Sequence, residues 1–367
     1  MGVTFGLGRY SYGLFLPNIR ADYGLGSGTL GLIATAATAS YLAATLLAPA
    51  LAIRNGARTP VLAGGLVAAA GMAVVALSTS ALVLAIGVVV AGASAGLGFT
   101  PYSAVVAARV APAARERSLT MISAGTGLGV LVAAPLALAA GGSWRVAWAV
   151  FAVMAIVVSV WSARVLGSDP VATTPSPVPR DRLPAGSGRM LGAAALAGLG
   201  SAVYWTFAVD LVVREGSLPR SSGSALLAGV GVAGIAGGLA GALVAGLGLR
   251  RALRAVAVTL AASLALLPLS ASSWAGVVCS SLLFGAAYNF LTGALAIWSA
   301  RLYSHAPSHG LATMLVALFA GQILGPTLAG LVADRWDLDT AFFLGAAVVM
   351  ASLALAPPHQ TAVRRSS

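Results

Sequence analysis

The sequence contains very little charge. Charged residues make up only 8% of its 367 residues, whereas soluble proteins carry about 25%. Hydrophobic residues make up 59% of the chain, and the mean hydropathy is +0.95. This composition excludes an ordinary soluble protein, so we expect the chain to lie in a lipid bilayer.

The sequence contains one cysteine and no lysine. The single cysteine, Cys279, excludes an intramolecular disulfide and a cysteine-rich metal site. Because it lies within an apolar run, we interpret it as a small core residue. The 21 basic residues are all arginine and give a net charge of +12. They lie at the ends of apolar runs, where charge bias sets the orientation of membrane spans, so we expect no nucleic-acid partner.

What the sequence does contain is a series of apolar runs, each close to the ~20 residues that a helix needs to cross a bilayer. Solid blocks such as "VLAGGLVAAAGMAVVAL" differ from the alternating ten-residue segments of a β-barrel. We therefore predict an all-α membrane protein with twelve transmembrane helices. Their predicted residues are 1–20, 26–53, 59–79, 81–108, 118–140, 145–166, 190–213, 222–247, 252–271, 274–300, 311–333 and 338–357.

The longest polar break in the chain is "GSDPVATTPSPVPRDRLPAGSG", whose proline, serine and charge are typical of a solvated linker. It predicts four parts. These are an N-terminal six-helix bundle (1–166), a cytoplasmic linker (167–189), a C-terminal six-helix bundle (190–360) and a cytoplasmic tail (361–367).

The arginines predict the orientation of the spans. With the amino terminus and the linker on the cytoplasmic side, fifteen arginines lie inside and five outside, which agrees with the positive-inside rule. We therefore expect a multi-pass protein of the cell (inner) membrane with both termini cytoplasmic. The five outer arginines are Arg20, Arg145, Arg214, Arg220 and Arg335, and Arg9 belongs to neither set.

The two halves of the chain repeat each other. "GLGRYSY" from Gly6 and "GLGSAVY" from Gly198 share a Gly-Leu-Gly and a tyrosine at an offset of 192 residues. Several matches at one offset predict a parallel duplication, in which two pseudo-symmetric bundles rock around a site near the membrane midplane. The other matches, at an offset of 191 or 192, are Pro49 with Gly241, Pro135 with Pro326, and Trp144 with Trp336.

The loop "IRNGARTP" at 53–60 resembles the first signature loop of the major facilitator superfamily, an Asp-Arg-x-Gly-x-Arg pattern. The resemblance covers essentially the whole chain and implies a transporter with this family's fold. Arg54, Gly56 and Arg58 match, whereas Ile53 replaces the aspartate. In the family this loop takes part in a charge relay that latches one state, so the resemblance implies a coupling or gating role for Arg54 and Arg58.

Two further motifs narrow the resemblance. "GTGLGVLVAAP" (125–135) partly matches a glycine-rich antiporter motif, and "GQILGPTLAG" (321–330) is a better copy of it. The first span contains an arginine, an aromatic residue, any residue and a tyrosine in that order, followed by Leu-Pro. This pattern is similar to that of the YbfB-type bacterial permeases of the superfamily.

Arg9 is the main candidate for substrate recognition. It precedes Arg20, at the outer end of the first span, by 11 residues, or about 16 Å at 1.5 Å per residue, which places it near the midplane. On a helical wheel Gly2, Gly6, Arg9, Gly13 and Pro17 share one stripe, which we expect to face protein. A central arginine is costly in a bilayer and by default functional, and its donors suit a carboxylate or a phosphate. The alternative is that Arg9 snorkels or caps backbone carbonyls.

Other polar and aromatic groups within the spans are candidates for the same site. A lone polar group there is costly unless it faces water or a partner. Asn289 and Gln322 are expected to line a cavity, with interhelical hydrogen bonding as the alternative. For the aromatic residues, packing is an equally good interpretation. The remaining substrate-binding candidates are Tyr12, Tyr102, Tyr204 and Tyr288.

Asp210 and Asp339 are the acids within the predicted spans, and Asp339 is only the second residue of the last span. We consider a coupling or gating role for Asp210. The alternative is a solvated charge at a helix end that pairs with Arg214 four residues later. The coupling partner, a proton or a counter-anion, is left open by the sequence, as is facilitated diffusion.

The sequence favours a secondary active transporter of a small organic solute, with an anion or carboxylate first because of Arg9. An efflux antiporter for drugs or lipophilic metabolites is the alternative, and a non-transporting solute sensor is a third.

The acids and histidines form no catalytic constellation, so we expect no enzyme. His305 and His309 are separated by Pro307 and are not expected to bind a metal. We expect no cofactor and a monomer.

Overall fold

In a computed structural model of the chain, residues 1–56, 58–140, 143–166, 183–216, 218–219 and 221–357 are described. All regular elements in these ranges are helices. The elements of the first half are η1 (Gly2–Arg9, a π-helix), α1 (Ser11–Tyr23), α2 (Ser27–Asn55), α3 (Arg58–Ala76), α4 (Ala81–Arg109), α5 (Pro112–Ala139) and α6 (Trp144–Leu166).

The second half is also helical throughout its described residues. Its elements are α7 (Ser187–Glu215), α8 (Ser221–Gly234), η2 (Ile235–Leu239, a 3-10 helix), α9 (Ala240–Leu247), α10 (Leu249–Leu269), α11 (Trp274–Leu302), α12 (Pro307–Arg335), α13 (Leu338–Ala351) and η3 (Ser352–Leu355, a 3-10 helix). The all-helical membrane fold expected from the sequence is confirmed.

Ten helical segments of the described residues are long and apolar enough to cross a membrane. The predicted spans 1–20 and 118–140, which coincide with η1–α1 and with α5, are not among these ten. The chain is therefore a multi-pass membrane protein, and the number of twelve spans stays a prediction.

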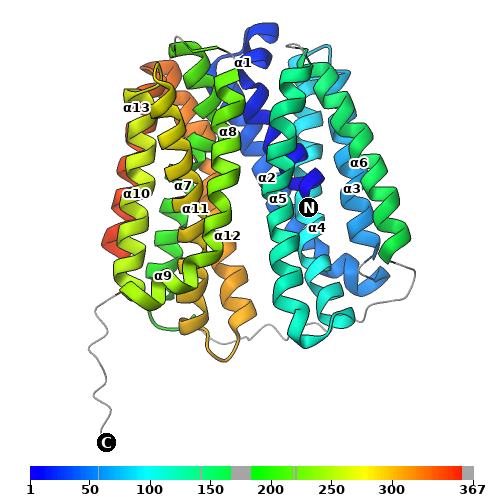
Figure 1. Cartoon of the computed structure of the whole chain (residues 1–367), viewed down its shortest axis with the longest axis vertical. Coiled ribbons are helices and arrows are strands. Elements are labelled where there is room, and N and C mark those ends of the chain that lie inside the picture. Colours follow the sequence, from blue (N-terminus) through cyan, green and yellow to red (C-terminus); the bar gives the residue numbers. More distant parts are fainter. Residues whose placement is uncertain (57, 141–142, 167–182, 217, 220, 358–367) are drawn as a thin grey trace, which may run out of the picture.

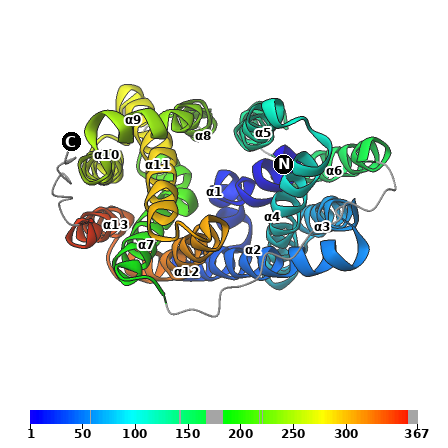
Figure 2. The same cartoon turned by 90° about the horizontal axis from the view of Figure 1, so that it is seen from below.

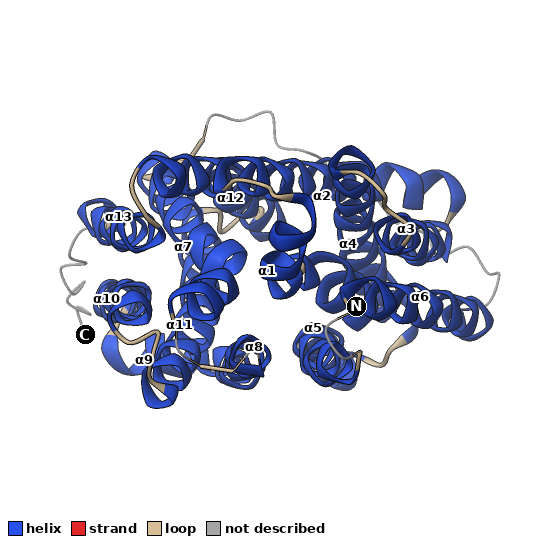
Figure 3. Ribbon diagram, turned by 90° about the horizontal axis from the view of Figure 1, so that it is seen from above, coloured by secondary structure: helices blue, strands red, loops and turns tan. Residues whose placement is uncertain are grey.

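The helices lie in two groups, seen end-on in Figures 2 and 3. In Figure 1, α2 to α6 lie on one side and α7 to α13 on the other. The groups meet where α2 packs along α12, where α1 packs on α7, and where α5 approaches α8. We call the end that holds the connection from α1 to α2 the outer end, following the predicted orientation. The predicted domain boundaries stay predictions, and both 167–182 and the tail lie outside the described residues.

The first predicted helix is divided into two parts. The backbone N–H of Tyr10 donates to the Phe5 carbonyl at 3.2 Å, the five-residue spacing of a π-helix, and regular α-helix begins at Ser11. Met1 lies midway along the height of the molecule (Figure 1), so residues 1–23 span only the outer part of the bundle. The expectation of one continuous helix over 1–20 is therefore wrong in this detail, because the α-helical wheel does not extend through Arg9.

The glycines of the first segment face protein, as expected. Gly6 and Gly13 are buried, and a Cβ at Gly13 would lie only 2.5 Å from the Trp205 carbonyl oxygen in α7. Small residues allow this close approach of two helices. The approach places the residues that precede Gly13, including Arg9, at the junction of the two groups.

The core consists of large apolar side chains between the helices, while apolar residues also cover the outside, as a lipid-facing surface requires. Cys279 lies on this outside of α11 and is exposed, so its interpretation as a core residue is wrong. A lipid-facing thiol has the same apolar surroundings as a core thiol, which is why the sequence does not separate the two. Fully buried side chains include Trp148, Phe151, Phe207, Phe284 and Phe342.

Candidate functional site

Arg9 lies at the end of η1, where the two groups of helices meet. Its Nη2 donates to the side-chain oxygen of Gln322 in α12 at 3.1 Å. Its guanidinium carbon lies 4.1 Å from the ring centre of Tyr41 in α2 and 5.1 Å from that of Phe319 in α12. Arg9 thus contacts side chains of both halves.

The partners of Arg9 are neutral. No acidic side chain within the described part of the chain forms a salt bridge with it. Removing a cation from water without a counter-charge costs free energy, and aromatic faces and an amide oxygen compensate only part of that cost. The arrangement therefore leaves a positive potential available for an anion.

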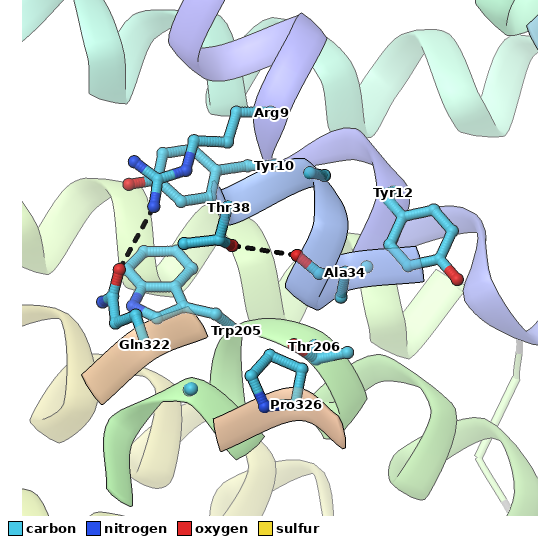
Figure 4. A pocket seen from close by; sticks show the side chains of 12 residues that line it. Arg9, Tyr10, Tyr12, Ala34, Thr38, Trp205, Thr206, Gln322 and Pro326 are labelled. Atoms are coloured by element: carbon cyan, nitrogen blue, oxygen red, sulfur yellow. Dashed lines mark hydrogen bonds between the residues drawn. The ribbon is translucent and has the colours of Figure 1, made fainter. Parts of the chain in front are cut away.

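A cavity of about 60 Å³ lies beside Arg9 (Figure 4). Gln322 links two sides of this site, because its Nε2 donates to the Tyr288 hydroxyl at 2.7 Å while its oxygen accepts from Arg9. The structure thus brings together Arg9, Gln322 and Tyr288, three of the residues predicted from the sequence. Side chains that line the cavity include Arg9, Tyr10, Tyr12, Thr38, Trp205 and Gln322.

Tyr10 and Trp205 form the aromatic side of the cavity. Their rings stack at 4.5 Å between centres with an angle of 27°. The Trp205 indole nitrogen is buried and has no hydrogen-bond partner in the described structure. Buried indole N–H groups usually have a partner, so this donor is an unpaired polar group in a residue that lines the cavity.

Four predicted residues are placed differently. Tyr12 lines the cavity, but its hydroxyl donates to the Leu30 carbonyl at 3.0 Å and points away from Arg9 (Figure 4). Tyr204 is buried within the second half, where its hydroxyl lies 3.1 Å from the Ser280 hydroxyl. Asn289 donates to a carbonyl of its own helix, and neither it nor Tyr102 lines the cavity.

Tyr41 and Phe319 are site residues that the sequence analysis did not identify. Their rings meet edge to face at 4.7 Å, although they come from α2 and α12. Each lies singly in an apolar run, and neither is part of a motif identified in the sequence. Only the packing of two helices far apart in the sequence makes them neighbours of Arg9.

Arg20 and Asp210 join the two halves near the outer end. Arg20 binds both carboxylate oxygens of Asp210, with Nη2 at 2.8 Å from Oδ2 and Nε at 3.3 Å from Oδ1. Asp210 is fully buried, so the alternative of a solvated helix-end charge is wrong. Arg214 lies at 3.7 Å and is a secondary partner. The sequence missed this pairing because Arg20 and Asp210 lie on α1 and α7.

Asp334 provides a second contact between the halves at the outer end. It lies in the last turn of α12, and its carboxylate accepts from the backbone N–H groups of Ser27 and Gly28 at 2.7 and 2.8 Å. These N–H groups begin α2 and have no partner within their own helix. An acid of one half therefore caps a helix of the other half, which the sequence analysis did not foresee.

A second, larger cavity of about 800 Å³ lies near the outer end, between α1, α5, α7 and α8. Asp22 and Arg145 line it and form an ion pair at 2.6 Å. The Trp144 indole, which donates to Asp22 at 2.8 Å, and then Arg145 hold the pKa of this carboxyl below its usual range. Asp22 thus stays ionised and ties the end of α1 to the start of α6.

Arg54 and Arg58 flank the turn between α2 and α3 at the inner end. Arg54 is exposed in the last turn of α2, and Arg58 begins α3. The buried Nε of Arg58 has no hydrogen-bond partner. Their coupling or gating role stays a prediction.

The sequence matches a protein family over residues 1–356, that is, over nearly the whole chain. The family is described as "Uncharacterised MFS-type transporter YbfB". The chain belongs to this family. As a YbfB-family member it is a membrane transporter, and the resemblance inferred from its motifs is confirmed. No curated protein sequence matches it.

Solved structures share this fold of the YbfB-family chain. A variant of the nucleoside transporter NupG superposes with a TM-score of 0.78 at 12% identity, covering 96% of this chain and 97% of that one. A bacterial homologue of the human lysosomal transporter Spinster, in an inward-facing and occupied conformation, gives a TM-score of 0.73 at 14% identity, with 96% and 92% covered. At this identity the likeness concerns the fold alone.

Proposed function

We propose that this YbfB-family protein is a secondary active transporter of a small organic anion, with a carboxylate as the group that Arg9 recognises. One observation carries the proposal. A permanent cation lies at the junction of the two halves, beside a cavity, and its partners among the described residues are an amide oxygen and aromatic rings, without a carboxylate. An anionic substrate supplies the missing counter-charge, and a charge-assisted hydrogen bond is about twice as strong as a neutral one.

The experiment is transport of radiolabelled carboxylates into proteoliposomes by the wild-type protein and by Arg9→Gln. We expect the variant to lose transport, because glutamine keeps hydrogen bonding but removes the charge. Arg254→Gln is the matched control, since it removes one exposed arginine from α10, outside the cavity. Undiminished carboxylate transport by a well-folded Arg9→Gln protein would refute the proposal.

Alternating access is supported by the contacts at the outer end. Arg20 with Asp210, and Asp334 with the start of α2, hold the halves together there. We assign Asp210 a gating role, because its pair with Arg20 must separate before a solute can enter from outside. Imposing a pH gradient tests whether a proton drives transport. Preloading the vesicles with an anion tests whether a counter-anion drives it.

The proposed architecture is two pseudo-symmetric bundles of six spans in the cell (inner) membrane, with both termini cytoplasmic. One pair of glycines supports the duplication. Gly56 has φ 75° and ψ 162°, and Gly248, 192 residues later, has φ 76° and ψ 150°. Both glycines follow a helix at the inner end, so the two halves turn there in the same way.

Efflux of lipophilic metabolites by antiport is the second candidate. The aromatic side of the cavity, Tyr10 on Trp205, favours it because ring faces bind apolar and cationic compounds. A binding screen with carboxylates, nucleosides and lipophilic cations separates the candidates by ligand charge. A solute sensor would bind a ligand without any flux in proteoliposomes.

A further inference from the structure

Aromatic rings of both halves gather around the Arg9 guanidinium, although aromatic residues make up only 7% of the chain. The Tyr41 face lies 4.1 Å from the guanidinium carbon, and Tyr10 stacks on Trp205. Tyr10 of the first half and Trp205 of the second half both line the cavity beside Arg9, so ring surface of both halves borders this space. A ligand with an aromatic ring next to a negative charge stacks its ring on such side chains while its charge pairs with Arg9.

The polar groups that face the cavity are mainly donors. Arg9 gives one N–H to Gln322 and has further donors in the same fork. The Trp205 indole N–H has no partner among the described residues, and Figure 4 shows its ring beside Gln322. Leaving a buried donor unpaired is costly. A ligand with two separate acceptors would satisfy both Arg9 and Trp205.

We infer that the site binds aromatic carboxylates, an inference that rests on the proposed function. The carboxylate of the ligand pairs with Arg9 in place of the Gln322 oxygen, because an ionised acceptor displaces a neutral one. The ring of the ligand lies against the rings of Tyr10 and Trp205, which line the cavity. The Trp205 N–H donates to an oxygen of the same ligand.

The size of the cavity decides how such a ligand enters. The space beside Arg9 is about 60 Å³, whereas a cavity of about 150 Å³ is known to admit a benzene ring. An aromatic carboxylate therefore enters only after Gln322 releases Arg9 and the two halves separate locally. The site is therefore contracted in this structure, and Gln322 accepts the hydrogen bond of Arg9 that the ligand would take.

The test measures the affinity of the purified full-length protein for three matched probes. Benzoate has the ring and the charge, cyclohexanecarboxylate has the charge without a π face, and benzamide has the ring without the charge. We expect benzoate to bind about tenfold more tightly than either of the others, from ring stacking in one comparison and charge pairing in the other.

Variants separate the ring contacts from the charge. Tyr10→Leu and Trp205→Leu remove one ring each from the cavity and are expected to reduce the preference for benzoate over cyclohexanecarboxylate. Trp161→Leu is the matched control, because Trp161 is 66% exposed on α6 and lies outside the cavity. It is expected to leave all three affinities unchanged.

Each outcome has one meaning. Equal affinity for the two carboxylates, both tighter than benzamide, overturns the aromatic inference and leaves the proposed anion transport standing. Equal affinity for benzoate and benzamide overturns both, because the charge then has no role. Failure of all three probes to bind overturns the aromatic inference, and the Arg9→Gln transport experiment then judges the proposed function by itself.

Discussion

Two arginines of the first segment, Arg9 and Arg20, differ in their partners. The difference supports the proposed role of Arg9 in substrate recognition and of Arg20 in closing the outer end. Arg20 binds both oxygens of the buried Asp210, so its charge is balanced within the protein. Arg9 has an amide and aromatic rings around it. The two arginines are eleven residues apart on one segment. The first has neutral partners among the described residues, whereas the second is paired with an acid of the other half.

We predict that Asp210→Asn weakens the outer contact between the halves. Removing one partner of a buried ion pair costs about 3 kcal/mol, because the other charge stays uncompensated. We take this value from the lower end of the measured costs, because Asp210 is fully buried but Arg20 is 19% exposed. Thermal unfolding in detergent measures the loss of stability as a lowered midpoint.

Arg214→Gln is the control for this prediction. Arg214 lies 3.7 Å from Asp210 and is 46% exposed, so solvent screens its contribution. We expect a change of only a few tenths of a kcal/mol. Equal losses of stability in the Asp210 and Arg214 variants would contradict the assignment of Arg20 as the main partner.

At the scale of single elements, η1 and α2 depend on other parts of the fold. The π-helix ends at Arg9, and π-helical turns are frequent at functional sites because they alter which side chains face a neighbour. The start of α2 has no capping side chain of its own, and Asp334 of α12 supplies the acceptor. Both features lie where the halves meet.

We predict that Asp334→Ala opens the outer end. Loss of a helix cap costs about 1 kcal/mol, and here the lost cap also joins α12 to α2. Spin labels at Leu77→Cys and Leu269→Cys report the opening as a longer distance, in a Cys279→Ser background. Both leucines are exposed, at the ends of α3 and α10.

Asp337→Ala provides the matched control, because Asp337 caps its own helix α13 by accepting from the Thr340 N–H at 2.6 Å. It loses a cap of the same kind without touching α2. We expect its label distance to stay at the wild-type value. An unchanged distance in the Asp334 variant would show that this cap does not hold the outer end closed.

At the scale of the whole molecule, close helix approach between the halves defines the closed state. A Cβ at Gly31 in α2 would overlap the Pro326 carbonyl of α12, whose carbon it would approach to 2.8 Å. Thr35 of α2 also donates to the Ile323 carbonyl at 2.6 Å along the same contact. The two helices therefore touch through backbone, and any added side chain must separate them.

We predict that Gly31→Ala shifts the protein towards an open outer end, seen as a longer distance between the labels at Leu77→Cys and Leu269→Cys. The physical reason is steric, so the shift is independent of salt. Gly241→Ala is the control, because a Cβ there meets nothing within 4 Å. A normal distance in Gly31→Ala would mean that α2 and α12 adjust without opening.

The sequence by itself determined the membrane class, the all-helical architecture and the family, because apolar runs and short motifs are local properties. It also selected Arg9, Tyr288 and Gln322, since polar groups within apolar runs are conspicuous. Only the tertiary structure decided what surrounds them. Tyr41 and Phe319 meet Arg9, Arg20 pairs with Asp210, and Asp334 caps α2. Each of these contacts joins residues of different helices, and the packing of two halves that sets them leaves no local signal in the chain.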